Sequence, residues 1–431
     1  MNATACHLRP GRNFLLLAAL TVCFCCGQLA EPLPAGAQSA GADAEYHTPV
    51  AGEAQTVHFL GRTIELPAID RGYLTSLTLG GAYFNPKVGT SIGVPAGALF
   101  IRRLTDDYRA RGVFSIVVNE LEYARRDDYW ELVTHFENNT LPVDIKELRD
   151  NREIKGTSLT WGTALASVGP GLRFSVDPYD VDSDFRLQLL GRVGYQYVKR
   201  TSDTGADVVA PPDTFLYGAR LRGHYDGLTR NLLELPHRGL AAGFDLDYLH
   251  RDRWSDLSAA GSDVHRNYLQ VKGYLVGAGG IPGLSERDRV LLYLGAGKTS
   301  DGDADRFNAF LINGGPFPSE SDDMPRPHYT GIVYPDVRAT NYATASVGYR
   351  RELTFFLYLS LVGSYIWADR ATVQGMDQVV FRDKTGVSGT VSLDCAFLWN
   401  SALYLGFTRD SGFIRNGKAG NGVILLWSKM L

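Results

Sequence analysis

The chain has 431 residues, of which 45% are apolar and 21% charged, a balance typical of folded proteins rather than disordered ones. Beyond the amino terminus no stretch approaches the roughly 20 apolar residues that a membrane helix needs, which excludes a multi-helix membrane protein. The formal net charge of −4 argues against a general nucleic-acid binder, because neutralising phosphates needs a basic surface.

Residues 1–37 are typical of a signal peptide. Arg9 and Arg12 precede the apolar run 14–26, and Ala35-Gly36-Ala37 fits a cleavage site. A retained N-terminal helix and lipidation at Cys23 are the alternatives. All but one of the five cysteines lie in this segment, so the mature chain would keep Cys395 alone, which rules out a disulfide framework within one chain.

Residues 38–71 are rich in Ala, Gly and Pro and show little periodicity. We interpret them as a flexible periplasmic leader. The segment is too short for a series of periplasmic domains.

From residue 72 onward apolar and polar residues alternate, which indicates strands with two different faces. In the segment 184–200, Leu187, Leu189 and Val193 share one face, and Arg186 and Arg192 the other. We expect 14 to 16 such strands. Among the predicted segments are 112–125 as one strand, 157–167 and 169–176 as two, and 306–312 as another.

Two architectures satisfy this alternation. A soluble sandwich or propeller would turn the apolar faces inward, whereas a membrane barrel turns them toward lipid. Segments of 10–16 residues, aromatic residues near their ends and the export signal favour the barrel. We therefore predict an all-β fold, a transmembrane antiparallel β-barrel of about 14–16 strands formed by residues 72–431.

Several short motifs resemble a known family. They are Phe310-Leu311-Ile312-Asn313-Gly314-Gly315, the run 337–353, Leu357-Tyr358-Leu359, Ser364-Tyr365-Ile366-Trp367 and Leu235-Pro236-His237-Arg238-Gly239. They are similar to those of the bacterial surface antigen superfamily of BamA-like outer-membrane barrels, and above all to the barrel fused behind patatin-like phospholipases. The resemblance implies a barrel-only member in a Gram-negative outer membrane.

That family has an Arg-Gly-aromatic tip on a loop inserted into the lumen. This chain lacks the tip, and Tyr329-Thr330-Gly331 or Asp336-Val337-Arg338 is nearest to it. The segment 314–338 is therefore the candidate for a lumen loop, and an exterior loop is the alternative. Residues 423–431 resemble the closing strand of such barrels, although the chain ends in Leu431 rather than the usual Phe.

The polar strand faces supply the candidate functional residues, which would line the lumen and affect permeation or hold a plugging loop. The candidates are Arg186, Arg192, Arg220, Arg222, Asp245, Asp247, Lys272, Arg350 and Asp394, with Glu120 and Glu122 beside them. Because both signs are present, the sequence indicates no preference for anions or cations.

No catalytic, metal or cofactor site is predicted. The histidines form no His-x-x-x-His pair, and Asp301, Asp303 and Asp305 lack the rest of a calcium loop. His224 with Asp226, and His250 with Asp252, share strand faces and could serve a triad, but lumen-lining residues explain them without catalysis.

We therefore expect a porin-like or assembly-type outer-membrane protein, not an enzyme, that mediates passage or insertion of a substrate. Its partners would be outer-membrane lipid and the barrel-assembly machinery during biogenesis. A plugged structural or adhesive barrel is the first alternative and a barrel-embedded lipid hydrolase the second.

Overall fold

The computed structural model describes residues 46–431 except 89–90, 116, 141–145, 147, 150–151, 177–182, 207, 209, 255–265, 301–304, 320–323, 333–336, 374–377, 398–399, 414 and 416. Contacts divide the chain into two units, Met1–Tyr46 and His47–Leu431. The predicted signal peptide lies outside the described residues. In the described part no helix is long and apolar enough to cross a membrane.

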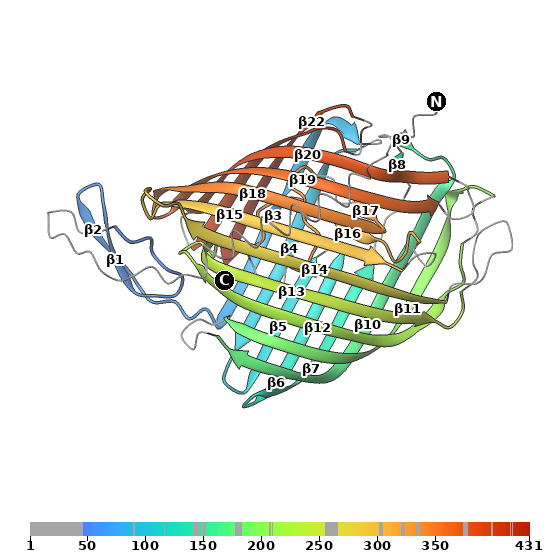
Figure 1. Cartoon of the computed structure of the whole chain (residues 1–431), viewed down its shortest axis with the longest axis horizontal. Helices are drawn as coiled ribbons and strands as arrows, with labels where there is room; N and C mark the ends of the chain where they lie inside the picture. The colour runs from blue at the N-terminus through green and yellow to red at the C-terminus, as the bar shows by residue number, and fades with distance from the viewer. Residues whose placement is uncertain are drawn as a thin grey trace, which may run out of the picture. The chain divides into compact units, whose positions relative to one another are not determined.

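Sixteen antiparallel strands close into one barrel (Figure 1). They are β3 (Tyr73–Val88), β4 (Ser91–Leu104), β5 (Tyr108–Ser115), β6 (Val118–Asp127), β7 (Trp130–Thr140), β10 (Thr157–Ser175), β11 (Asp184–Thr204), β12 (Thr214–Arg230), β13 (Pro236–Arg251), β14 (Asn267–Gly280), β15 (Asp288–Thr299), β18 (Asn341–Thr354), β19 (Leu357–Val373), β20 (Gln378–Phe397), β21 (Ser401–Asp410) and β22 (Gly420–Met430). Closure is made between β22 and β3, in a ladder from Asn421↔Asn85 to Met430↔Ser76. The predicted barrel and its closing strand are thus confirmed.

Three pairs of short strands lie outside the barrel. They are β1 (Gln55–Phe59) with β2 (Arg62–Leu66), β8 (Leu148–Arg149) with β9 (Arg152–Glu153), and β16 (Phe310–Ile312) with β17 (Val337–Ala339). We call the barrel end where β3 begins and β22 ends the terminal end. The opposite end, which carries the connection between β15 and β18, is the loop end.

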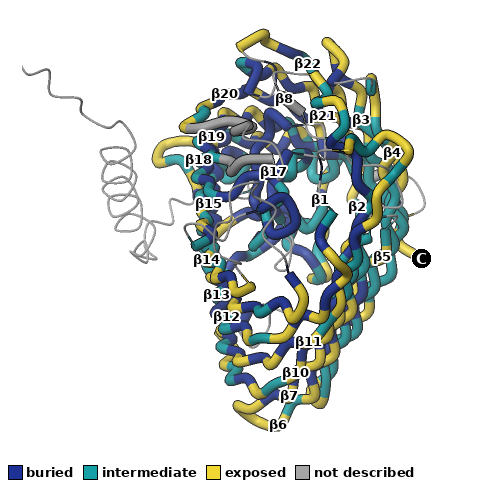
Figure 2. Tube along the Cα trace, turned by 90° about the vertical axis from the view of Figure 1, so that its right-hand side faces the viewer, coloured by how far each residue is buried: buried dark blue, intermediate teal, exposed yellow. Residues whose placement is uncertain are grey.

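The alternation predicted from the sequence governs which side chains face outward. Along β11, Leu189 and Val193 are exposed, at 56% and 58%, whereas Arg186 and Arg192 on the other face are buried. Figure 2 shows the same change from buried to exposed along the other strands. Apolar side chains outside and charged ones inside are the arrangement of a barrel in lipid. Closed barrels of this kind span outer membranes, so the protein is a membrane-embedded barrel of the outer-membrane type.

Three predicted segments are corrected. The segment 112–125 is not one strand, because β5 and β6 meet there in a tight hairpin. The segments 157–167 and 169–176 belong to one strand, β10, which continues through Pro170 in register with Leu132 of β7. The segment 306–312 is not a barrel strand, since only its last residues form the short strand β16.

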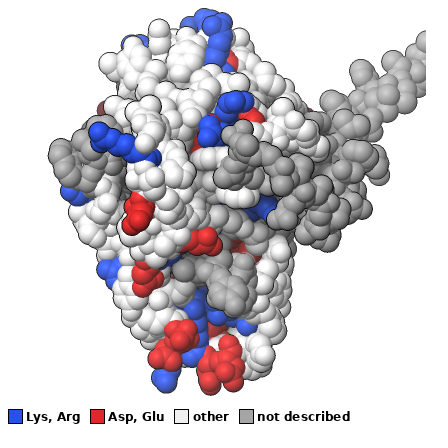
Figure 3. Space-filling model, turned by 90° about the vertical axis from the view of Figure 1, so that its left-hand side faces the viewer, with Lys and Arg blue, Asp and Glu red and all other residues white. Residues whose placement is uncertain are grey.

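Part of the predicted leader, residues 38–71, has regular structure over its described residues. The hairpin β1–β2 lies within them, and Phe59 packs edge-on against Phe355 and Phe356 in the turn between β18 and β19. Figure 3 views the molecule from the side on which β1 and β2 lie in Figure 1. Acidic and basic side chains are interspersed on this face.

Candidate functional site in the barrel interior

Register explains why opposite charges meet inside the barrel. Arg220 of β12 lies directly opposite Asp247 of β13, and Arg222 lies opposite Asp245. Asp245 in turn lies opposite Lys272 of β14. Because inward positions recur every second residue, one shared register brings all of these charges to the same side of the sheet.

The best-connected acidic groups are Asp247 and Glu137, each shared by the same two arginines. Asp247 Oδ1 lies 2.6 Å from Arg192 Nη1 and 2.6 Å from Arg220 Nε. Glu137 of β7 lies 3.4 Å from Arg220 Nη1 and pairs with Arg192 as well. All four side chains are at least four-fifths buried, so each charge depends on the others for compensation.

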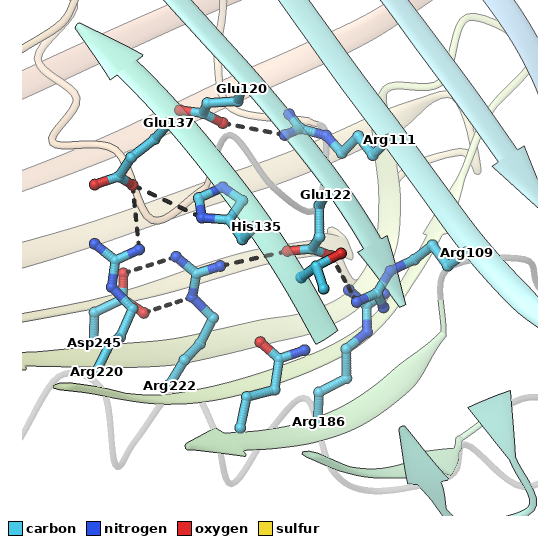
Figure 4. A network of polar contacts seen from close by, with 12 residues as sticks. Arg109, Arg111, Glu120, Glu122, His135, Glu137, Arg186, Arg220, Arg222 and Asp245 are labelled. Carbon is cyan, nitrogen blue, oxygen red and sulfur yellow. Dashed lines mark hydrogen bonds and ion pairs between the residues drawn. The ribbon is translucent and has the colours of Figure 1, made fainter. Parts of the chain in front are cut away.

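A second group of charges joins strands that are not neighbours (Figure 4). Arg222 of β12 forms a 2.8 Å ion pair with Asp245 and lies 3.8 Å from Glu122 of β6. Glu122 also pairs with Arg109 of β5 at 2.7 Å. Lys272 completes the group, 3.2 Å from Asp245. We call the inward face of β5–β7 and β10–β14 the charged wall.

The inward face of β18–β21 is different in character, and we call it the hydroxyl wall. Its buried polar side chains are mostly alcohols, namely Thr344, Ser346, Ser360, Ser364, Ser388, Thr390, Ser392 and Thr408. Ser346, Ser364 and Ser388 lie in one row across three strands.

The connection between β15 and β18 folds into the lumen. We call its part Asn313–Thr330 the lumen loop. Met324 and Tyr329 within it are fully buried. The predicted lumen loop is thus an interior loop over the part of 314–338 that the structure describes.

The lumen loop contacts both walls. On the hydroxyl wall, Thr330 Oγ1 lies 2.8 Å from Ser364 Oγ and 3.0 Å from Ser388 Oγ. Toward the charged wall, Arg326 forms a 3.1 Å ion pair with Glu120 of β6. The Tyr293 hydroxyl also donates to the Arg326 carbonyl at 2.9 Å. The loop therefore lies across the interior, attached on two sides by polar contacts.

His328 lies in this loop, outside the membrane-spanning strands. Burial lowers its pKa to about 4, although the backbone of Gly315 and Pro316 opposes the shift. The imidazole is therefore neutral at pH 7 while the loop is packed inside the barrel.

Aromatic and cationic side chains anchor the connection near the loop end. Arg338 lies over the ring of Trp161, 4.6 Å from its centre. Arg251 of β13 lies 3.8 Å from the ring centre of Trp254 and also pairs with Asp305. Stacking of guanidinium groups on rings is favourable where water is excluded.

At the terminal end the segment His47–Gly52 attaches to the barrel. Thr48 donates a 2.7 Å hydrogen bond to buried Glu352 of β18. The Ala51 amide donates to the Arg230 carbonyl at 3.0 Å. The Arg230 side chain in turn donates through Nε to the carbonyl of Ser319 at 2.9 Å. Arg230 thus contacts both the N-terminal segment and the lumen loop.

The structure places the predicted lumen residues as follows. Buried inside the barrel are Arg186, Arg192, Arg220, Asp245, Asp247, Arg350 and Asp394, while Arg222 and Lys272 are half-buried. Of the lumen-loop candidates, Tyr329, Gly331 and Arg338 are buried, and Asp336 lies outside the described residues. Their roles in function stay predictions.

Sequence reasoning did not single out Glu137, Glu131, Arg109, Arg111 or Asp184. The alternation around Glu131, with Leu132 and Phe136 exposed on the other face of β7, carries the signal that would have found the two glutamates.

The two histidine pairs considered for catalysis have other partners. His224 Nδ1 lies 2.5 Å from the Tyr274 hydroxyl, and Asp226 pairs with Arg230 at 2.7 Å. His250 Nδ1 lies 2.6 Å from Asn267 Oδ1. Among the described residues no group of three or more His, Cys, Asp or Glu could hold a metal ion.

Neither protein-family models nor curated protein sequences match this chain. Solved structures of outer-membrane barrels do align with it. BamA from Haemophilus ducreyi aligns at 12% identity and a TM-score of 0.46, over 88% of this chain and 75% of that one. CdiB from Acinetobacter baumannii aligns at 9% identity and a TM-score of 0.48, over 88% of this chain and 66% of the CdiB chain. The toluene transporter TodX from Pseudomonas putida aligns at 10% identity and a TM-score of 0.34, over 84% of this chain and 91% of the TodX chain.

BamA and CdiB are thus among the solved structures that align with this chain. This chain spans about two thirds of the CdiB chain. The proposals below therefore rest on the geometry of the barrel itself.

Proposed function

We propose that this protein is an outer-membrane barrel through which a substrate passes, or by which it is inserted, once the lumen loop leaves the interior. The protein acts without covalent chemistry. Its partners are outer-membrane lipid on the apolar exterior and the barrel-assembly machinery during biogenesis.

The attachment of the lumen loop carries this proposal. Its hydrogen bonds through Thr330 and its ion pair through Arg326 are contacts that water can replace. The loop lies beside the hydroxyl wall, whose buried alcohols would become solvated after it leaves. Phe317 and Met324 also pack in an apolar cluster with strand residues, so displacement of the loop exposes some apolar surface. The strand ladders do not include the loop, and it can therefore leave without unfolding the strands.

A disulfide between loop and wall tests the proposal. Thr330 and Ser364 have their hydroxyl oxygens 2.8 Å apart, close enough for cysteines there to be joined. We would make Thr330→Cys with Ser364→Cys in a Cys395→Ser background and record conductance in planar bilayers. We expect no conductance when oxidised and channel openings after reduction, with Cys395→Ser alone insensitive to reductant. Equal conductance in both states would contradict the gating role of the loop.

A second candidate function is a structural barrel that never opens. The observation that favours it is the pairing of Glu122 and Glu137 with Arg222 and Arg220, which joins parts of the wall without the lumen loop. If the barrel stays silent after residues 315–326 are replaced by two glycines, while heat-modifiable gel migration shows that it is folded, this alternative is favoured.

A further inference from the structure

One buried carboxylate in the hydroxyl wall is left without a protein partner. Asp394 of β20 faces the interior and is 8% exposed. It has no hydrogen bond or ion pair with any residue in the part of the chain that the structure describes. A buried carboxylate without a donor is costly, so this position calls for a group from outside the protein.

The nearest cation does not meet that need. Arg350 of β18 is itself buried and donates to Ser360 Oγ at 3.1 Å and to the Pro236 carbonyl at 3.0 Å. No ion pair joins it to Asp394 among the described residues. The guanidinium is thus held by Ser360 of β19 and by Pro236 at the start of β13, and although Arg350 lines the same cavity as Asp394, it forms no ion pair with the carboxylate.

Asp394 opens onto a narrow cavity beneath the lumen loop. Thr390, Ser392, Tyr404 and Arg350 line it on the wall side, and Phe317 lines it on the loop side. The cavity has room for a group about the size of one water molecule. Its size excludes a large ligand and leaves space for a small head group whose remainder extends toward the lumen.

Two buried tyrosines lie opposite Asp394 in the neighbouring ladders, Tyr358 of β19 and Tyr404 of β21. Of the two, Tyr404 lines the cavity, whereas the Tyr358 hydroxyl donates to the Phe355 carbonyl. Aromatic faces attract cations, and ammonium groups are the ligands for which proteins combine rings with a carboxylate. The nearby hydroxyls add acceptors for the N–H groups of such a ligand.

We propose that this cavity, which we call the Asp394 cavity, is a binding site for an ammonium group. A carboxylate lacking a hydrogen-bond donor, the ring of Tyr404 and a space of the size of –NH3+ match that group in charge, shape and hydrogen bonding. The ammonium group could belong to a small free amine or to a lysine side chain of a polypeptide in the lumen. The proposal does not depend on whether the barrel conducts.

Thermal unfolding of the purified barrel in detergent provides the test, because a ligand that binds only the folded state stabilises it by RT ln(1 + [L]/Kd) and so raises Tm with the logarithm of its concentration above Kd. The probe is methylammonium chloride, compared with sodium and potassium chloride at equal ionic strength. We expect such a rise in Tm with methylammonium only. Identical curves for all three salts would overturn the proposal, since they would indicate water or any monovalent cation in the cavity.

The decisive variant is Asp394→Asn. We expect the methylammonium concentration that gives a set rise in Tm to be at least tenfold higher than for the unmodified protein. Its own Tm without ligand should be unchanged or higher, because the substitution removes a buried charge that lacks a partner. Glu352→Gln, which changes a buried carboxylate outside the cavity lining, is the matched control and should bind methylammonium normally. Undiminished binding by Asp394→Asn would refute the assignment.

A second pair of variants tests the aromatic contribution and does not alter Asp394. Tyr404→Phe keeps the ring and should bind as before, whereas Tyr404→Leu should bind several-fold more weakly. Equal binding by these two variants would contradict the role of the ring.

The source of the ammonium group is tested with two peptides. N-acetyl-Gly-Lys-Gly-amide is compared with its norleucine counterpart, on the unmodified barrel and on Gly314→Ala, which should loosen the lumen loop but keeps every residue that lines the cavity. A rise in Tm with the lysine peptide alone would identify a chain-borne lysine as a ligand. A response to methylammonium but to neither peptide would identify a small free amine.

Discussion

Glu122 on β6 and Arg222 on β12 form a 3.8 Å ion pair, although β7, β10 and β11 lie between their strands. The contact is made across the interior rather than along a ladder, and Glu137 with Arg220 repeats it nearby. The charged wall therefore supports the barrel as well as lining it.

Removing Arg220 is expected to destabilise the barrel strongly. Arg220→Ala leaves Asp247 and Glu137 with one arginine between them in a buried site, a loss on the order of 3–5 kcal/mol. Urea unfolding of the barrel in detergent measures the change in the free energy of unfolding. Arg253→Ala, at a side chain 77% exposed, is the control and should shift it by less than about 0.5 kcal/mol. Similar midpoints for the two variants would show that the charged wall contributes little to stability.

A charged residue on the outward face of β11 should destabilise the barrel in lipid. Val193 is 58% exposed and lies among apolar outward positions. In lipid vesicles Val193→Arg should lower the free energy of unfolding by about 2–4 kcal/mol, the cost of arginine near the bilayer midplane. Val193→Leu should change it by less than about 0.5 kcal/mol. No difference between the two would mean that this face does not contact acyl chains.

A side chain at Gly314 should loosen the lumen loop. A Cβ there would lie 1.5 Å from the Ile332 carbonyl oxygen, so Gly314→Ala forces the two ends of the loop apart. Under the proposed gating role this variant should open in planar bilayers many times more often than the unmodified protein. Gly389→Ala, where a Cβ would meet nothing within 4 Å, is the matched control. Equal opening frequencies in the two variants would show that the packing of the lumen loop at Gly314 does not control closure of the barrel.

Acid should favour displacement of the loop. His328 has a pKa of about 4 when packed, against an ordinary value of 6.5 when the loop is released. The displaced state therefore binds more protons as pH falls below 6.5, and the packed state loses stability progressively down to pH 4. Over that window the loss is about 3 kcal/mol, and below pH 4 it levels off.

The measurement is opening frequency in planar bilayers between pH 7.5 and 4. His328→Gln, which cannot take up the proton, should flatten the profile. A profile as steep in this variant as in the unmodified protein would assign the acid response to other groups.

The sequence was sufficient to predict the inverted barrel, because alternation is a local property. Leu189 and Arg192, for example, lie on opposite faces of the same strand. Strand limits were harder to predict. The turn between β5 and β6 contains no Gly or Pro, and Pro170, which suggested a break, instead lies within β10 and pairs with β7.

The contacts that define the interior could not be read from the sequence. Glu122 and Arg222 are 100 positions apart, and nothing near either residue specifies that barrel closure brings them together. Asp394 could be placed on an inward face, but its lack of a partner depends on the direction in which Arg350 is held.

Arg230 joins the N-terminal segment to the lumen loop. Its carbonyl accepts from Ala51, and its guanidinium donates to Ser319 of the lumen loop. A displacement of this one residue at the terminal end would therefore alter both attachments together, although the loop enters from the opposite end.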